Sequence, residues 1–268
     1  MHQISHLEIY RLLQKSNRRK CDLPSCLAFA AAVMRGEKRL DQCPYVDGSV
    51  LEQLKVRLHP QSPIQDERDK TLRQLRAQIQ AVDFAEAAER LEVSHSGNTL
   101  AVRCLSKDFR IAPDGNVRSD CHMTPWLIIP LLSYIINGAG EKIAGRWVLF
   151  KELDGGADWG RLFAQRCEKP LKKLIDTHTD LFEDIIDIFD GRPIEDSSPC
   201  DFSIAIHPLP KVPVLIRYWK KEGDFDSALT LMFDSTAKDN LGIEPLYTIC
   251  VGLLTMFERI ALTHGNRY

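Results

Sequence analysis

The order of apolar and polar positions along the chain predicts an α+β protein. Apolar residues recur at helical spacing over several segments, and alternation or short β-branched runs predict strands in the middle of the chain. The expected helices cover residues 4–15, 24–36, 48–57, 66–91, 126–136, 158–175, 180–190, 224–233 and 243–261. The expected strands cover residues 99–105, 108–112, 147–153, 202–207 and 212–219.

A proline-containing break divides this pattern. The segment from Pro60 to Pro63 holds two prolines and polar residues, which disfavour both helix and strand. We therefore predict a small helical module in residues 1–60 and a larger domain in residues 64–268. The expected fold class is α+β, with the helical module packed on a mixed α/β domain.

Composition and charge narrow the class of protein. The chain has 268 residues and a formal net charge of -2, which gives no electrostatic reason to expect nucleic-acid binding. The basic run from Lys15 to Lys20 is local. No secretory pattern opens the sequence, and no apolar run reaches the roughly twenty residues of a membrane span. We expect a cytoplasmic protein without a membrane partner.

The main candidate chemistry lies in three cysteines near the N-terminus. The chain holds eight cysteines, and in a cytoplasmic protein these remain thiols or bind metal. Cys21, Cys26 and Cys43 surround one short predicted helix. Cys26 falls at the start of that helix, where the backbone N–H groups favour a thiolate and an anionic cluster. The Cys43-Pro44 step is typical of bacterial ferredoxin motifs.

These residues resemble the small [4Fe-4S] module of the corrinoid iron–sulfur protein large subunit of anaerobic acetyl-CoA metabolism. The resemblance is carried by the segments Leu7–Leu13, Ser16-Asn17, Cys26–Ala30 and Cys43-Pro44. The family pattern is Cys-x2-Cys-x4-Cys-x16-Cys, and Cys21, Cys26 and Cys43 match its last three positions. The first position falls on Arg18, and the glycines usual nearby are replaced by Arg19 and Asp22.

The rest of the chain resembles an uncharacterised domain that occurs behind such modules in anaerobes. This second resemblance implies no function. The segments that carry it are Pro125-Trp126, Gly145–Val148, Leu209–Pro213 and Leu231–Asp234.

The ligand missing at Arg18 leaves several metal centres open. We favour Cys121, between a strand and an apolar helix, as the fourth ligand of a [4Fe-4S] cluster, with its neighbour His122 as the runner-up. Three cysteines alone would give a [3Fe-4S] cluster or a [4Fe-4S] cluster with one open iron. Zinc held by four cysteines, or by three cysteines and a histidine, is the main competitor.

The function expected from this resemblance is that of an oxygen-sensitive iron–sulfur protein. It would serve electron transfer or an accessory role in anaerobic metabolism, linked to one-carbon or corrinoid chemistry, with a redox or corrinoid protein as partner. One alternative is an enzyme that binds its substrate at an open iron. The other is a zinc-binding or metal-free interaction protein, and the oligomeric state stays open.

Overall fold

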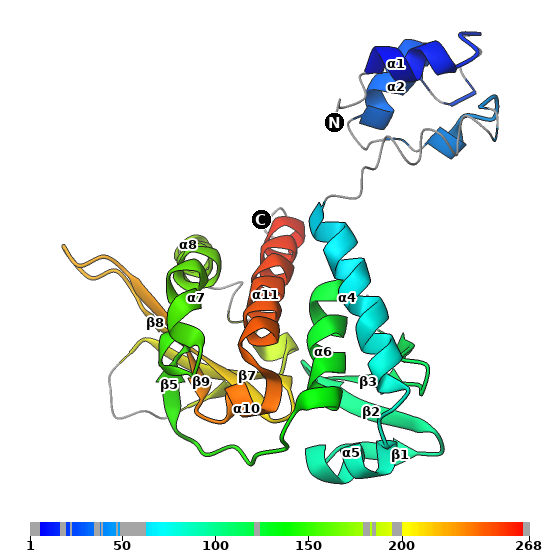
Figure 1. Cartoon of the computed structure of the whole chain (residues 1–268). Helices are drawn as coiled ribbons and strands as arrows, with labels where there is room; N and C mark the ends of the chain where they lie inside the picture. The colour runs from blue at the N-terminus through cyan, green and yellow to red at the C-terminus, as the bar shows by residue number, and fades with distance from the viewer. Residues whose placement is uncertain are drawn as a thin grey trace. The chain divides into compact units, whose positions relative to one another are not determined.

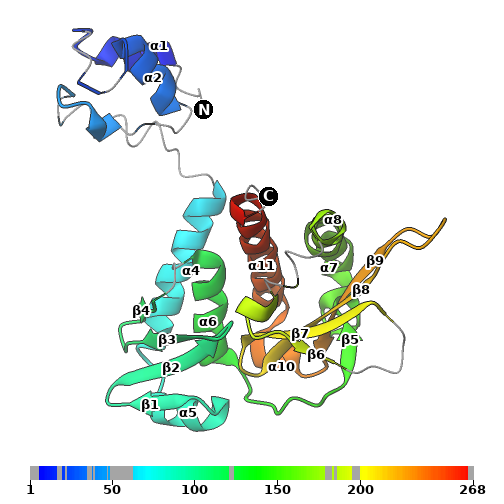
Figure 2. The same cartoon turned by 180° about the vertical axis from the view of Figure 1, so that it is seen from behind.

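The structure is a computed structural model that describes residues 6–16, 20–21, 23–34, 38, 40–46, 48, 63–120, 124–178, 183, 186–194 and 200–264. The chain forms two compact units, Met1–Asp69 and Lys70–Tyr268, which Figures 1 and 2 show from opposite sides. The domain boundary at residues 60–64 stays a prediction, because residues 49–62 lie outside the described part of the chain.

The first unit contains the predicted helical module. Helix α1 spans His6–Leu12 and helix α2 spans Cys26–Met34, both inside the predicted ranges. A short 3-10 turn follows at Leu40–Gln42. The two helices enclose a small apolar core made by Ile9, Leu13, Cys21, Phe29, Ala30 and Leu40. The helix predicted over residues 48–57 falls almost wholly outside the described residues.

The single helix predicted over residues 66–91 is wrong, because the chain forms two helices there. Helix α4 spans Pro63–Ile79 and helix α5 spans Phe84–Leu91. Asp83 begins the second helix, since its Oδ1 accepts hydrogen bonds from the backbone N–H groups of Ala85 at 2.8 Å and Glu86 at 3.3 Å. Asp83 thus satisfies backbone N–H groups at the start of α5, which in a continuous helix would donate to carbonyl groups of the preceding turn.

Two antiparallel sheets form the centre of the second unit. The first has the order β1-β2-β3-β4, with strands Ser94–Ser96, Thr99–Cys104, Lys107–Ile111 and Val117–Arg118. The second has the order β5-β9-β8-β7-β6, with strands Trp147–Leu149, Ala228–Asp234, Val212–Trp219, Phe202–Leu209 and Arg192–Pro193. Together with the helices they confirm the α+β class.

Two predicted elements of the second sheet need correction. The helix predicted over residues 224–233 is wrong, because Ala228–Asp234 is strand β9 and pairs along β8 from Val214↔Phe233 to Trp219↔Ala228. The strand predicted over residues 147–153 is too long, since β5 ends at Leu149 and a 3-10 turn, Phe150–Glu152, follows. Cross-strand pairing with β8 overrides the weak helical spacing of the first segment.

Helices cover the apolar face of this second sheet. They are α7 (Gly156–Phe163), α8 (Lys169–Thr177), α10 (Ala237–Leu241) and α11 (Ile243–His264), and a π-helical turn, Ala164–Glu168, joins α7 to α8. Helix α6 (Pro125–Asn137) packs against α11. In Figure 1 helices α7 and α11 lie in front of the sheet. Phe163, Phe233 and Phe257 are each at most 2% exposed in the shared core.

The sheet and its helices are also joined by one half-buried carboxylate. Glu168 in the π-helical turn accepts a hydrogen bond from the backbone N–H of Leu231 at 3.2 Å. Leu231 is the neighbour of Met232 in β9, and Met232 forms the last pair with β5. Burial raises the pKa of Glu168, and this hydrogen bond partly offsets the effect. The side chain therefore stabilises the sheet edge where β5 ends.

Helix α11 is long and apolar enough over Ile243–Leu262 to cross a membrane, by length and composition alone. The core helix of a globular domain passes the same test. Leu246, Ile249 and Phe257 of α11 pack in the core of the second unit. The apolar side of the helix is thus used at least in part for packing inside this unit.

Candidate metal centre

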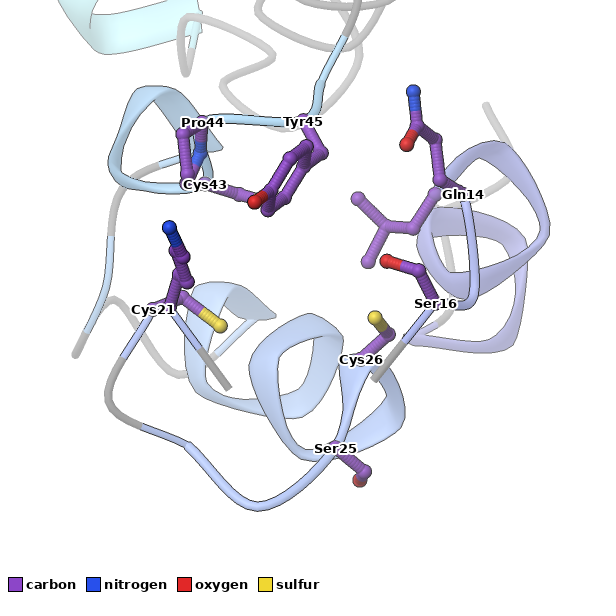
Figure 3. A pocket seen from close by; sticks show the side chains of 10 residues that line it. Gln14, Ser16, Cys21, Ser25, Cys26, Cys43, Pro44 and Tyr45 are labelled. Carbon is purple, nitrogen blue, oxygen red and sulfur yellow. The ribbon is translucent and has the colours of Figure 1, made fainter. Parts of the chain in front are cut away.

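A pocket in the first unit is lined by all three N-terminal cysteines. Cys21, Cys26 and Cys43 share it with Leu13, Gln14, Ser16, Lys20, Ser25, Pro44 and Tyr45. Figure 3 shows the sulfur atoms of Cys21 and Cys26 pointing into the same space. The cavity between these residues measures about 20 Å³ and is open to solvent. The sequence spacing thus corresponds to a real convergence of thiols.

Helix α2 places Cys26 at its first turn. The preceding residue, Ser25, caps the helix, because its Oγ accepts a hydrogen bond from the backbone N–H of Ala28 at 3.1 Å. The carbonyl of Ser25 accepts the first intrahelical bond from Phe29 at 3.0 Å. Cys26 is therefore the first helical residue, where exposed N–H groups and the helix dipole favour negative charge.

The other two cysteines are fixed by different parts of the module. Cys21 is 8% exposed and belongs to the small apolar core. Cys43 follows the 3-10 turn, and its backbone N–H donates to the carbonyl of Leu40 at 3.2 Å. Its own carbonyl accepts from the N–H of Val46 at 3.3 Å, which closes a second turn around Pro44. The pocket is built on these turns and on the start of α2.

The net positive charge of the N-terminal sequence favours an anionic group. Residues 1–46 contain eight Lys and Arg against four Asp and Glu. One of these cations, the exposed Lys20, lines the pocket itself. A nearby ammonium group stabilises thiolates and the negative charge of a metal–thiolate centre.

A zinc ion and an iron–sulfur cluster would place their cysteine ligands differently. Sulfurs bound tetrahedrally to one zinc ion lie about 3.8 Å apart, given a zinc–sulfur bond of about 2.3 Å. Among the residues that the structure describes, no group of three His, Cys, Asp or Glu side chains is close enough to hold a single ion. In an iron–sulfur cluster, by contrast, each cysteine binds its own iron, so the ligands need not meet at one ion.

The five predicted ligands divide into two groups. Cys21, Cys26 and Cys43 lie together, as their spacing predicted. Cys121 and His122 fall outside the described residues, so the cross-domain ligand stays a prediction. Lys20, which we expected to influence the cluster's potential, also lines the pocket, and so do Ser16 and Tyr45, to which the sequence analysis gave no site role.

The other described cysteines belong to different surroundings. Cys104, Cys167 and Cys250 are buried in the core of the second unit. Burial raises the pKa of the Cys167 thiol to about 12, and it raises the pKa of Cys250 as well. Because the thiolate is the metal-binding form, these cysteines are poor ligands. This agrees with the sequence-based assignment of Cys250 to the core.

Lys211 and Asp234 lie in two of the segments that resemble the uncharacterised domain, and both stabilise the fold. Lys211 is 7% exposed, and its ammonium group donates to Glu92 at 2.9 Å and to the carbonyl of Gly140 at 2.7 Å. Asp234 is fully buried and accepts hydrogen bonds from the N–H groups of Ala144 at 3.1 Å and Gly145 at 2.7 Å. Both side chains anchor the loop between α6 and β5.

Comparison with protein families identifies both parts of the chain. A family model described as "Putative Fe-S cluster" matches residues 13–45, which include all the residues that line the pocket. A second model, described as "Domain of unknown function (DUF3786)", matches residues 83–256. Part of the first unit is therefore similar to an iron–sulfur cluster family, and the match covers Cys21, Cys26 and Cys43.

Curated relatives match the chain only in part. The acetyl-CoA decarbonylase/synthase complex subunit gamma of Methanocaldococcus jannaschii is 41% identical over 56 residues, which are 21% of this chain and 12% of that subunit. The corrinoid/iron-sulfur protein large subunit of Moorella thermoacetica is 42% identical over 57 residues, again 21% of this chain and 13% of the relative. No solved structure matches the chain.

Proposed function

Because the chain belongs to the family of the Domain of unknown function (DUF3786) and carries an iron–sulfur cluster domain ahead of it, we propose an electron-transfer or accessory role in one-carbon metabolism. The observation that carries this proposal is the pocket on which Cys21, Cys26 and Cys43 converge. Thiolate ligands of this kind bind zinc, copper(I) and iron–sulfur clusters, and the match to the family described as "Putative Fe-S cluster" supports the cluster.

The proposed cofactor is a [4Fe-4S] cluster held by these three thiolates. A bound cluster would accept and donate single electrons. The N–H groups at the start of α2 and the ammonium group of Lys20 would stabilise its negative charge, and so influence its potential. For the fourth position the sequence proposes Cys121, with His122 as runner-up, and a [3Fe-4S] cluster is the form without a fourth ligand.

The relatives support the metabolic setting without fixing a step. Their names place them in the acetyl-CoA decarbonylase/synthase complex and among corrinoid iron–sulfur proteins. Since the chain covers only 12% and 13% of their lengths, their whole activities do not transfer to it. We propose a redox or corrinoid protein as partner, in the cytoplasm of an anaerobe, and we propose neither a nucleic acid nor a membrane.

An enzyme with an open iron is the second candidate. The observation in its favour is that the pocket opens to solvent while three cysteines line it. In such an enzyme a non-cysteine ligand at one iron would exchange with substrate. A cluster whose spectrum changes when small anions or thiols are added would support this candidate over simple electron transfer.

Metal analysis tests the proposed function. We expect the full chain, reconstituted anaerobically with iron and sulfide, to bind iron and acid-labile sulfide together and to turn brown, because thiolate-bound iron absorbs visible light. A parallel reconstitution with zinc alone serves as the control. Stoichiometric zinc that excludes iron and sulfide would contradict the proposal and favour a zinc-binding protein.

A further inference from the structure

The cysteine-lined pocket contains an oxygen donor in addition to its three thiols. Ser16 lines the same pocket, and Figure 3 shows its hydroxyl group pointing into the space that Cys21 and Cys26 face. Ser16 is exposed, so this part of the pocket is reached by solvent. It lies only two positions before Arg18, which occupies the place of the missing cysteine.

The backbone before Ser16 adopts an unusual conformation. Lys15 has a φ of 54°, in the left-handed region that residues other than glycine rarely occupy. The Lys15 ammonium group lies 5.6 Å from the centre of the Tyr10 ring, a cation–π contact that holds the turn after α1. Strained residues of this kind persist where the surrounding structure requires them, and here the turn sets the direction of Ser16.

The other oxygen donors of the pocket are less suitable. Ser25 already accepts the hydrogen bond from Ala28 that caps α2, and Figure 3 shows its hydroxyl pointing away from the pocket. The side-chain amide of Gln14 also points away in the same view. Tyr45 extends its ring into the pocket, so it is the one remaining hydroxyl that needs a direct test.

We infer that Ser16 supplies the fourth protein ligand of the cluster, through its Oγ as an alkoxide. This inference rests on the proposed function. The serine proton passes to water, the Oγ–iron bond forms, and the solvent ligand leaves that iron, so no electrons are exchanged. The Lys20 ammonium group, which lines the same pocket, favours the alkoxide by charge. One iron then carries a hard oxygen ligand and differs from the three bound by sulfur.

The test compares substitutions in the full chain after anaerobic reconstitution. For Ser16→Ala we expect iron to fall from about four to about three per chain, with the EPR signal of an oxidised [3Fe-4S] cluster. For Ser16→Cys we expect about four irons and a shifted reduction potential, because a soft thiolate replaces the alkoxide. Ser25→Asn is the matched control, since asparagine also caps helices while the hydroxyl is removed.

Two further variants make the outcome decisive. Unchanged iron content and an unchanged Mössbauer spectrum in Ser16→Ala would overturn the inference. Loss of one iron in Cys121→Ala or Tyr45→Phe, with none in Ser16→Ala, would assign the fourth position to that residue instead. A wild-type chain that binds no iron and sulfide would overturn the proposed function itself. This result differs from a cluster that forms in the wild-type chain and is unchanged in Ser16→Ala.

Discussion

Replacing Cys21, Cys26 or Cys43 singly by alanine is expected to remove most of the iron and sulfide from the reconstituted chain. Each thiolate supplies one bond to the cluster, and metal binding also supplies part of the folding free energy of a small module. Alanine is used because serine can itself bind iron. Iron and acid-labile sulfide per chain, measured after anaerobic reconstitution, check the prediction.

The unequal burial of these cysteines makes the comparison informative. Cys21 is buried, whereas Cys26 and Cys43 are half-buried. If the cysteines acted only by packing, Cys21→Ala would have the largest effect and the other two little. Cys200→Ala is the control, because Cys200 is half-buried and lies outside the pocket. Similar iron loss in Cys200→Ala would indicate nonspecific binding to thiols and contradict the assigned site.

Removal of the cluster is expected to unfold the first unit and leave the second unit folded. The described apolar core of the first unit consists of six buried residues, one of which is the proposed ligand Cys21. A core of this size rarely stabilises a fold without a metal or a disulfide. The second unit has its own large core, which includes Phe163 and Phe233.

Hydrogen exchange followed by mass spectrometry checks this prediction region by region. After anaerobic treatment with an oxidant and a chelator, amides in α2 should lose protection, while amides in β8 should keep it. Buffer without chelator is the control. Equal protection of α2 before and after iron removal would show that the module folds without its cluster, and equal loss in β8 would show that the two units unfold together.

The fold was predictable where the local pattern was strong. The alternation in residues 99–105 predicted β2, the segment 108–112 was expected to pair with it and forms β3, and the apolar segment 126–136 predicted α6. Strand β9 was missed because its residues Ala228–Asp234 are specified by their pairing with β8, a contact that local periodicity does not contain. The break before α5 depended on the capping role of Asp83, which a charged helical pattern conceals.

The part of the candidate site that could be predicted is the part indicated by the spacing of cysteines along the sequence. The intervals between Cys21, Cys26 and Cys43 predicted three candidate ligands around one helix, and the structure brings these side chains to one pocket. Ser16 was not found in this way. Its direction depends on the left-handed backbone at Lys15, and a lysine gives no sequence signal for that conformation.

The location of iron in the protein tests the central claim most directly. Crystals of the anaerobically reconstituted chain, measured on both sides of the iron absorption edge, would give anomalous density at the metal alone. We expect one compact group of iron peaks between the sulfur atoms of Cys21, Cys26 and Cys43. Iron bound away from these three residues, or a single zinc peak in their pocket, would contradict the account.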